Sequence, residues 1–304
     1  MKFIRSVPIA LCGLALALAA LGNLLLPHGM ALRYACGILS AMILILVILK
    51  IFLDFPHARE ELKTPIPLSV LPTATMTLML LSVYLRPYLG NGVTYLWYAT
   101  VIVHLWIMML FFKQFILSFK LGNVFPPWFI AFVGVVTASV TAPAMGAQVI
   151  GQAAFFVGFS LYFVALALVI YRMINVKLFP EPAKPTIAIF TAPMSLCIVG
   201  YFASFEQRNV TLIYIMLTIA VISYLYTSVK MISLLKIKFY PSYAAFTFPY
   251  VISALAFRVG NVFLQGRGIY FLAPIALISE WIAITMVLYV LGHYIRFFRF
   301  WLKF

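Results

Sequence analysis

Three ionisable side chains fall inside stretches of sequence that are otherwise apolar, and they are the residues best placed to do chemistry. Glu280 lies about ten residues into the last of these stretches, His104 lies at a similar depth in the fourth, and Arg258 lies near the outer end of the ninth. At 1.5 Å per helical residue, Glu280 is expected roughly 15 Å below the outer surface. Ionisable groups at such depth are costly, so each needs a partner or a function. Two roles stay open for Glu280. Either it is protonated, or bonded to His104 or Arg258, as a clip between helices, or it relays protons.

No other group of residues indicates catalysis. The sequence has no His/Asp/Glu cluster at metal-ligand spacing, no nucleophile near a base, no glycine-rich phosphate loop and no nucleotide motif. Cys12, Cys36 and Cys197 show no pairing pattern, so we expect them to be small apolar residues. We therefore expect no enzyme activity and no bound metal or cofactor.

The elements that carry the three ionisable residues are predicted to be membrane-spanning helices. Of the 304 residues, 65% are hydrophobic and only 9% are charged, which is too little polar surface for a soluble domain. Apolar runs of about 20 residues recur, without the short alternating segments of a β-barrel. The prediction is an all-α membrane protein with one transmembrane domain over residues 1–304. Its ten predicted spans are Val7–Leu26, Tyr34–Leu53, Pro67–Leu85, Val93–Phe115, Trp128–Met145, Ile150–Met173, Thr186–Phe205, Thr211–Leu234, Tyr243–Phe263 and Ile269–Phe297.

The net charge of +15 is distributed unevenly over the segments that connect the spans. With the N-terminus inside, the outer side keeps few of the 21 lysines and arginines, namely Arg33, Arg86, Arg208, Arg258 and Arg267. This positive-inside bias predicts that both termini are cytoplasmic and requires an even number of spans. It also explains the basic composition without nucleic acid. The N-terminal run resembles a secretory signal too, but its removal would leave nine spans and spoil the charge balance.

Prolines distinguish the odd-numbered spans from the even-numbered ones. An interior proline leaves a carbonyl without its helical donor, and in hydrocarbon such a group must be shielded by protein or face water. We therefore predict five helical hairpins, with an inner ring of kinked odd helices around a central pore and an outer ring of even helices. Only Pro274 intrudes into an even span, whereas four odd spans carry an interior proline: Pro72, Pro143, Pro193 and Pro249.

The inner spans also share an internal repeat. Pro185–Pro193 and Pro241–Pro249 share Pro, Phe, Thr and Pro at the same offsets, and Pro127–Phe132 has the same proline-to-phenylalanine spacing. A repeat inside membrane spans is typical of equivalent helices around one site. Phe248 occupies the position of Ala192 and Gly134, so one large ring among small equivalents is predicted to plug the axis, with ordinary packing as the alternative. The residues expected to line or kink the pore are Gly13, Pro72, Phe132, Gly134, Pro143, Phe190, Ala192, Pro193, Phe246 and Pro249.

The inner spans thus predict a conduit of small, hydroxyl-bearing and aromatic side chains without a fixed acid. Beside a basic inner surface, such a conduit repels cations and concentrates anions. Two functions remain open. One is an anion channel gated by Phe248, and the other is a proton-coupled carrier of four-carbon dicarboxylates such as malate, using His104 and Glu280. A membrane-embedded enzyme or an export subunit has no motif to support it.

Several strings carry a likeness to a known family. They are Leu21-Gly22-Asn23-Leu24, Ala138-Ser139-Val140-Thr141-Ala142-Pro143, Ala192-Pro193 with Gly200-Tyr201, and Phe246-Thr247-Phe248-Pro249. Together they resemble the tellurite-resistance/dicarboxylate transporter family, part of the voltage-dependent anion channel superfamily. This family includes the bacterial TehA-like proteins and the plant guard-cell slow anion channels. The similarity runs through nearly the whole chain.

The resemblance implies a fold, an assembly and a gate. It implies ten helices as five hairpins in pseudo-five-fold order around an anion pore, and a homotrimer in which each protomer has its own pore. It places Phe248 on the occluding phenylalanine of the family. It also implies a multi-pass protein of a bacterial-type plasma membrane. The substrate stays open among chloride, nitrate, malate-like dicarboxylates, and sulfite or tellurite-linked species.

Overall fold

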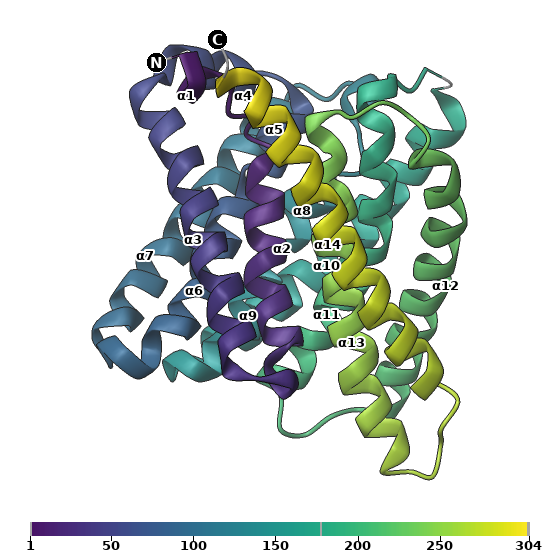
Figure 1. Cartoon of the computed structure of the whole chain (residues 1–304). Coiled ribbons are helices and arrows are strands. Elements are labelled where there is room, and N and C mark those ends of the chain that lie inside the picture. Colours follow the sequence, from purple (N-terminus) through teal and green to yellow (C-terminus); the bar gives the residue numbers. More distant parts are fainter. Residues whose placement is uncertain (1, 177, 303–304) are drawn as a thin grey trace.

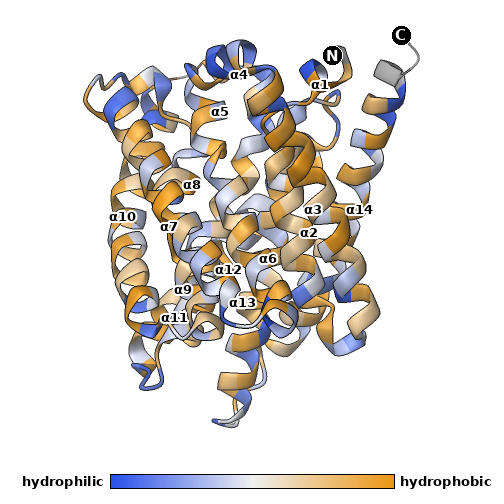
Figure 2. Ribbon diagram, turned by 90° about the vertical axis from the view of Figure 1, so that its left-hand side faces the viewer, coloured by the Kyte–Doolittle hydropathy of each residue, from blue (hydrophilic) through white to orange (hydrophobic). Residues whose placement is uncertain are grey.

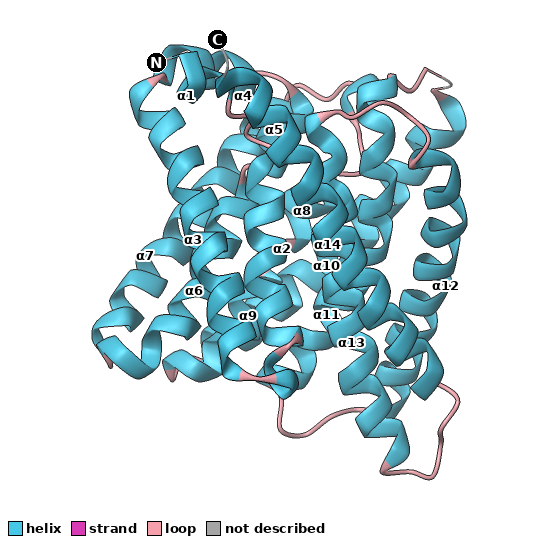
Figure 3. Ribbon diagram, in the orientation of Figure 1, coloured by secondary structure: helices cyan, strands magenta, loops and turns pink. Residues whose placement is uncertain are grey.

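The protein is a helical bundle whose polar residues lie at its two ends. The computed structural model describes residues 2–176 and 178–302, and over that range it contains helices and loops but no strands (Figure 1, Figure 3). Lys177 and Lys303, both counted on the inner side above, lie outside the described residues. Hydrophobic residues dominate the middle of the bundle (Figure 2). Both ends of the chain lie at the same end of the bundle, here called the terminal end (Figure 1).

Nine helices in the described residues are long and apolar enough to cross a membrane. Five are continuous: α3 (Met30–Leu53), α7 (Gly92–Phe111), α10 (Gln148–Asn175), α12 (Val210–Leu234) and α14 (Ala273–Leu302). Four consist of two segments: α5 and α6 (Pro65–Val70, Pro72–Leu89), α8 and α9 (Trp128–Val133, Val136–Met145), η4 and α11 (Glu181–Thr191, Ala192–Ser204), and η5 and α13 (Pro241–Phe246, Phe248–Gln265). The first predicted span contains a shorter apolar helix, α2 (Leu11–Leu24), which follows α1 (Lys2–Ser6).

Short elements connect these helices. The connections of the terminal end include α4 (Phe55–Leu62) and η3 (Leu121–Asn123), and η1 (Leu26–His28) joins α2 to α3. Phe112–Ile116, labelled η2, extends α7 by one wider turn. The last helix begins at Ala273, four residues later than predicted from the sequence, which brings Glu280 closer to the helix start.

Three of the four two-segment spans break where a proline lies at the start of the second helix. Pro72 is the first residue of α6, and Pro193 and Pro249 are the second residues of α11 and α13. Proline fits a first helical turn because its missing N–H has no helical partner there. The segments before two of these breaks, η4 and η5, are 3-10 helices. The repeat therefore encodes a tight segment followed by a new α-helix.

The fifth span breaks at a different residue from the one predicted. Its two segments part at Gly134 and Val135, whereas Pro143 lies inside α9, in its last turns. The carbonyl that Pro143 leaves without a helical donor belongs to Ser139. That carbonyl accepts a hydrogen bond of 2.7 Å from Ser204 Oγ of α11. A neighbouring helix thus supplies the donor, and α9 needs no break at Pro143.

Burial separates the broken spans from the continuous helices. In each two-segment span, 67% to 78% of the most apolar window is buried, against 28% to 33% in the continuous helices. Every residue of α2 except Asn23 is buried as well. Large apolar side chains such as Ile38, Trp106 and Phe156 are instead exposed on continuous helices. The broken spans and α2 therefore form the interior of the bundle.

The interior helices contact one another in a closed cycle. Helix α2 contacts α6, α6 contacts α9, α9 contacts α11, α11 contacts α13, and α13 returns to α2. Each continuous helix packs on the interior span that precedes it, as α3 packs on α2 and α14 on α13. The first and last parts of the sequence are thus neighbours in space.

Gly151 allows α10 to approach α9 closely. A Cβ on Gly151 would lie 2.7 Å from Ala142 Cβ and 2.5 Å from Ser204 Oγ. Because Ala142 Cβ moves only with its backbone, we predict that Gly151→Ala destabilises the protein by about 1–3 kcal/mol. The measurement is Tm in detergent. Gly292→Ala in α14, where the added Cβ meets nothing within 4 Å, is the control and should keep or raise Tm. Equal Tm values for the two variants would contradict the close-contact interpretation.

Candidate functional site

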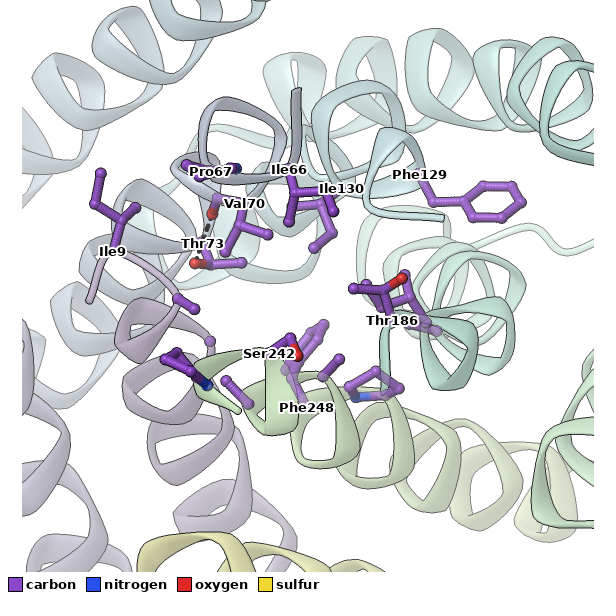
Figure 4. A pocket seen from close by; sticks show the side chains of 18 of the residues that line it. Ile9, Ile66, Pro67, Val70, Thr73, Phe129, Ile130, Thr186, Ser242 and Phe248 are labelled. Atoms are coloured by element: carbon purple, nitrogen blue, oxygen red, sulfur yellow. Dashed lines mark hydrogen bonds between the residues drawn. The ribbon is translucent and has the colours of Figure 1, made fainter. Parts of the chain in front are cut away.

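A cavity of about 340 Å³ lies among the interior segments (Figure 4). All five interior spans contribute to its wall, through residues such as Ile9, Val70, Ile130, Thr186 and Ser242. In each span these residues come from the part nearest the terminal end. The later parts, such as Cys197–Ser204 of α11, contribute no lining residue. The cavity therefore extends from the terminal end into the bundle.

Phe248 lies where the lining ends in the last interior span. It is the first residue of α13, it is 8% exposed, and it lines the cavity together with Gly134 and Ala192. These three residues hold equivalent positions in the repeat. Position 134 has no room for a side chain larger than that of glycine, because a Cβ there would lie 2.5 Å from the Ile130 carbonyl oxygen. Phe248 is thus the one large side chain among the three equivalents.

The other predicted lining residues divide into two groups. Gly13, Pro193 and Pro249 line the cavity with the three residues above. The remaining five are absent from its wall: Pro72, Phe132, Pro143, Phe190 and Phe246. The three phenylalanine rings among them pack between helices, on Trp128, Phe129 and Tyr243 respectively. The repeat thus positions its phenylalanines for packing and the residue two places later for the cavity.

The cavity wall carries almost no charge. Among the described residues, Glu61 of α4 is the one charged side chain in the lining, and it pairs with Lys50, which is 1% exposed. The hydroxyls of Thr73 and Thr186 donate to backbone carbonyls at 2.8 Å and 2.6 Å. The sequence analysis predicted a conduit without a fixed acid, because Glu61 lies in a connection between two predicted spans. Its pairing with Lys50 neutralises that acid.

Asp54 holds α4, and hence Glu61, in place at the terminal end. Its Oδ1 lies 2.7 Å from His57 Nδ1, and its Oδ2 lies 3.4 Å from Arg5 Nε of α1. Burial raises the pKa of Asp54, but the hydrogen bond from His57 and the charges of His57 and Arg5 outweigh it, so the pKa lies below its usual value. The contact is therefore present at neutral pH and is lost only as the pH falls through that lowered pKa.

Glu280 binds Arg258 and His28, and His104 is not its partner. Glu280 Oε2 accepts a hydrogen bond of 2.5 Å from Arg258 Nη2, and Oε1 lies 2.8 Å from His28 Nε2. Arg258 Nη1 also donates to the Leu24 carbonyl. The Glu280 side chain is 14% exposed and the Arg258 side chain 28%. The clip predicted through Arg258 is therefore present, and it joins the end of α2 to α13 and α14. Glu280 lies closer to the start of its helix than predicted, and His28 of η1 reaches its carboxylate.

His104 lies directly behind the cavity wall. It is fully buried, and its Nδ1 lies 2.7 Å from Thr75 Oγ1 of α6. Its Nε2 has no hydrogen-bond partner within the described part of the chain. A Cβ on the cavity residue Gly134 would lie 3.2 Å from His104 Cε1. Sequence reasoning missed both Thr75 and His28, because neither is unusual for its segment. His28 could be found only by knowing that the first and last hairpins are neighbours.

Comparison with known families now identifies the class of protein. The family model described as voltage-dependent anion channel matches residues 5–295, nearly the whole chain. The chain therefore belongs to this family of anion channels and transporters, which confirms the resemblance noted in the sequence. A search of curated proteins gives no match.

Loss of the Glu280 carboxylate should destabilise the junction of the first and last interior helices. Glu280→Ala leaves the half-buried guanidinium of Arg258 without its ion pair, so we predict a loss of about 1–3 kcal/mol and a lower Tm at neutral pH. Glu206→Ala is the control, because Glu206 is an exposed acid in the connection between α11 and α12. If the two variants melt together, the junction contributes nothing to stability.

Proposed function

We propose that this protein is an anion channel of the plasma membrane, with a pore at the centre of its five interior spans. The arrangement is ten helices as five hairpins, with odd helices inside, even helices outside, and both termini cytoplasmic. The observation that carries the proposal is the cavity to which all five interior spans contribute. The family resemblance further supports a homotrimer in a bacterial-type membrane. The exposed apolar side chains of the continuous helices would then contact lipid and neighbouring protomers.

The proposed pore lies beside the breaks in the interior helices. In hydrocarbon, backbone groups freed by a break need protein or water around them. The breaks at Pro72, Gly134, Pro193 and Pro249 all fall in buried spans, and three of these four residues line the cavity. A water-filled passage beside these breaks would hydrate the freed groups. The helix breaks and the cavity thus fit together in one conduit, because the backbone groups freed by the breaks need the water that the cavity would hold.

We propose that Phe248 closes this conduit. Its ring occupies the position at which the fifth and seventh spans carry glycine and alanine. An apolar constriction excludes water and ions even when it is not completely filled. Rotation of one ring, or a small shift at the start of α13, would widen the passage. The irregular backbone at Thr247 (φ −104°, ψ −82°), just before Phe248, separates η5 from α13 and offers a place for that shift.

Anion selectivity in this proposal comes from the distribution of charge rather than from a tight site. Within the part of the chain that the structure describes, the cavity wall holds one acid, Glu61, and Lys50 neutralises it. The connections at the terminal end carry most of the basic residues, so the positive potential there concentrates anions. A wall without fixed cations binds each anion weakly, which suits rapid passage. Small anions such as chloride and nitrate fit this description best.

Removal of the Phe248 ring should open the pore. We predict that Phe248→Ala raises anion conductance in planar bilayers by on the order of tenfold or more, because the apolar constriction is lost. Phe190→Ala is the matched control, since Phe190 belongs to the equivalent repeat but packs on Phe129 and Tyr226 away from the cavity. Wild-type current in Phe248→Ala would remove this residue from the mechanism.

One observation favours a second candidate function, a proton-coupled carrier of dicarboxylates. The Nε2 of His104, which has no partner among the residues that the structure describes, lies behind Gly134, so a proton there would add a positive charge beside the cavity. In this case a pH gradient should drive uptake of labelled malate into proteoliposomes, and His104→Gln should abolish that stimulation. Uptake that is the same with and without the gradient, in wild type and variant, supports the channel instead.

A further inference from the structure

A second cavity lies between α10, α12 and η4, apart from the central one. Its volume is about 250 Å³, and it shares no lining residue with the central cavity. Its polar lining consists of Arg172 from the last turn of α10, Lys184 from η4, and Lys230 and Ser233 from the end of α12. No acid lines it, and within the described residues none of the three cations belongs to an ion pair. Three basic residues thus line one hollow.

The Arg172 side chain is fixed in this hollow, and part of its guanidinium has no hydrogen-bond acceptor among the described residues. Its side chain is 1% exposed, and its guanidinium lies 4.7 Å from the ring centroids of both Phe125 and Phe179. Nη2 donates to the Leu178 carbonyl at 2.9 Å. Nε and Nη1 are buried and have no hydrogen-bond partner among the described residues. A buried cation with unpaired donors is costly unless an anion completes it.

We propose that this cavity binds the phosphate group of an anionic ligand. A guanidinium fixed between rings offers oriented donors to phosphate oxygens, and two ammonium groups add charge around them. The cavity lies at the ends of α10 and α12, and Ile170, Val229 and Ile232 of the same two helices are exposed and apolar. Basic pockets between the ends of membrane-spanning helices can bind the headgroups of anionic lipids. A lipid headgroup and free phosphate offer the same chemistry, and the test below distinguishes them.

This inference does not depend on conduction, so its test uses binding alone. The full chain, purified in detergent, is titrated separately with short-chain phosphatidylglycerol, short-chain phosphatidylcholine and inorganic phosphate, and the shift in Tm is followed. The test variant is Lys184→Gln/Lys230→Gln. The matched control, Lys113→Gln/Lys120→Gln, removes the same charge from exposed positions that line neither cavity. Because all four lysines are at least partly exposed, both variants should keep the wild-type Tm without ligand.

We expect phosphatidylglycerol to raise Tm in wild type and control, and its half-saturating concentration to increase by about tenfold or more in the test variant. The same pattern with inorganic phosphate alone would assign the cavity to free phosphate. Equal responses of the two double variants, or an equal response to zwitterionic phosphatidylcholine and phosphatidylglycerol, would overturn the proposal.

Discussion

The structure depends on one constraint, the need of every backbone polar group for a hydrogen-bond partner in a medium that offers none. Helices broken by proline or glycine expose such groups, so they cannot face lipid. In this chain the broken spans are the buried ones, and the continuous helices cover them. Where a broken helix meets a neighbour, a side chain supplies the donor, as Ser204 does for the Ser139 carbonyl. Where broken helices meet one another, a cavity remains.

The internal repeat explains how such a cavity acquires one distinct residue. Successive spans place a phenylalanine in the packing between helices and, two positions later, a residue against the cavity. That second position reads Gly134, Ala192 and Phe248 in the fifth, seventh and ninth spans. A repeated pattern with one enlarged position makes the wall of the cavity asymmetric, because a single large side chain stands among small equivalents. The same logic explains why the phenylalanines of the repeat, however prominent in the sequence, belong to the core.

Sequence reasoning succeeded where a property is local. Hydropathy located nine of the ten predicted spans in the described residues, with the shorter helix α2 in the first, and the interior prolines indicated which spans are buried. It failed where a property depends on how distant segments meet. The break in the fifth span lies at Gly134 rather than at Pro143, because Ser204 satisfies the carbonyl that Pro143 frees. The partners of Glu280 come from the two ends of the chain, so spacing could not pair it with His28. The sequence analysis included Arg172 only as one of the positive charges of the inner side, whereas the structure buries its side chain.

The most direct test of the account is the reaction of single cysteines with a membrane-impermeant thiol reagent, after replacement of the native Cys12, Cys36 and Cys197 by serine. Ala245 lines the central cavity, and Val164 is half exposed on the continuous helix α10. A thiol must be hydrated to react as the thiolate. The account predicts that Ala245→Cys is labelled from the terminal end and that Val164→Cys is not. Labelling of Val164→Cys together with protection of Ala245→Cys would show that the broken helices do not enclose the water-filled passage.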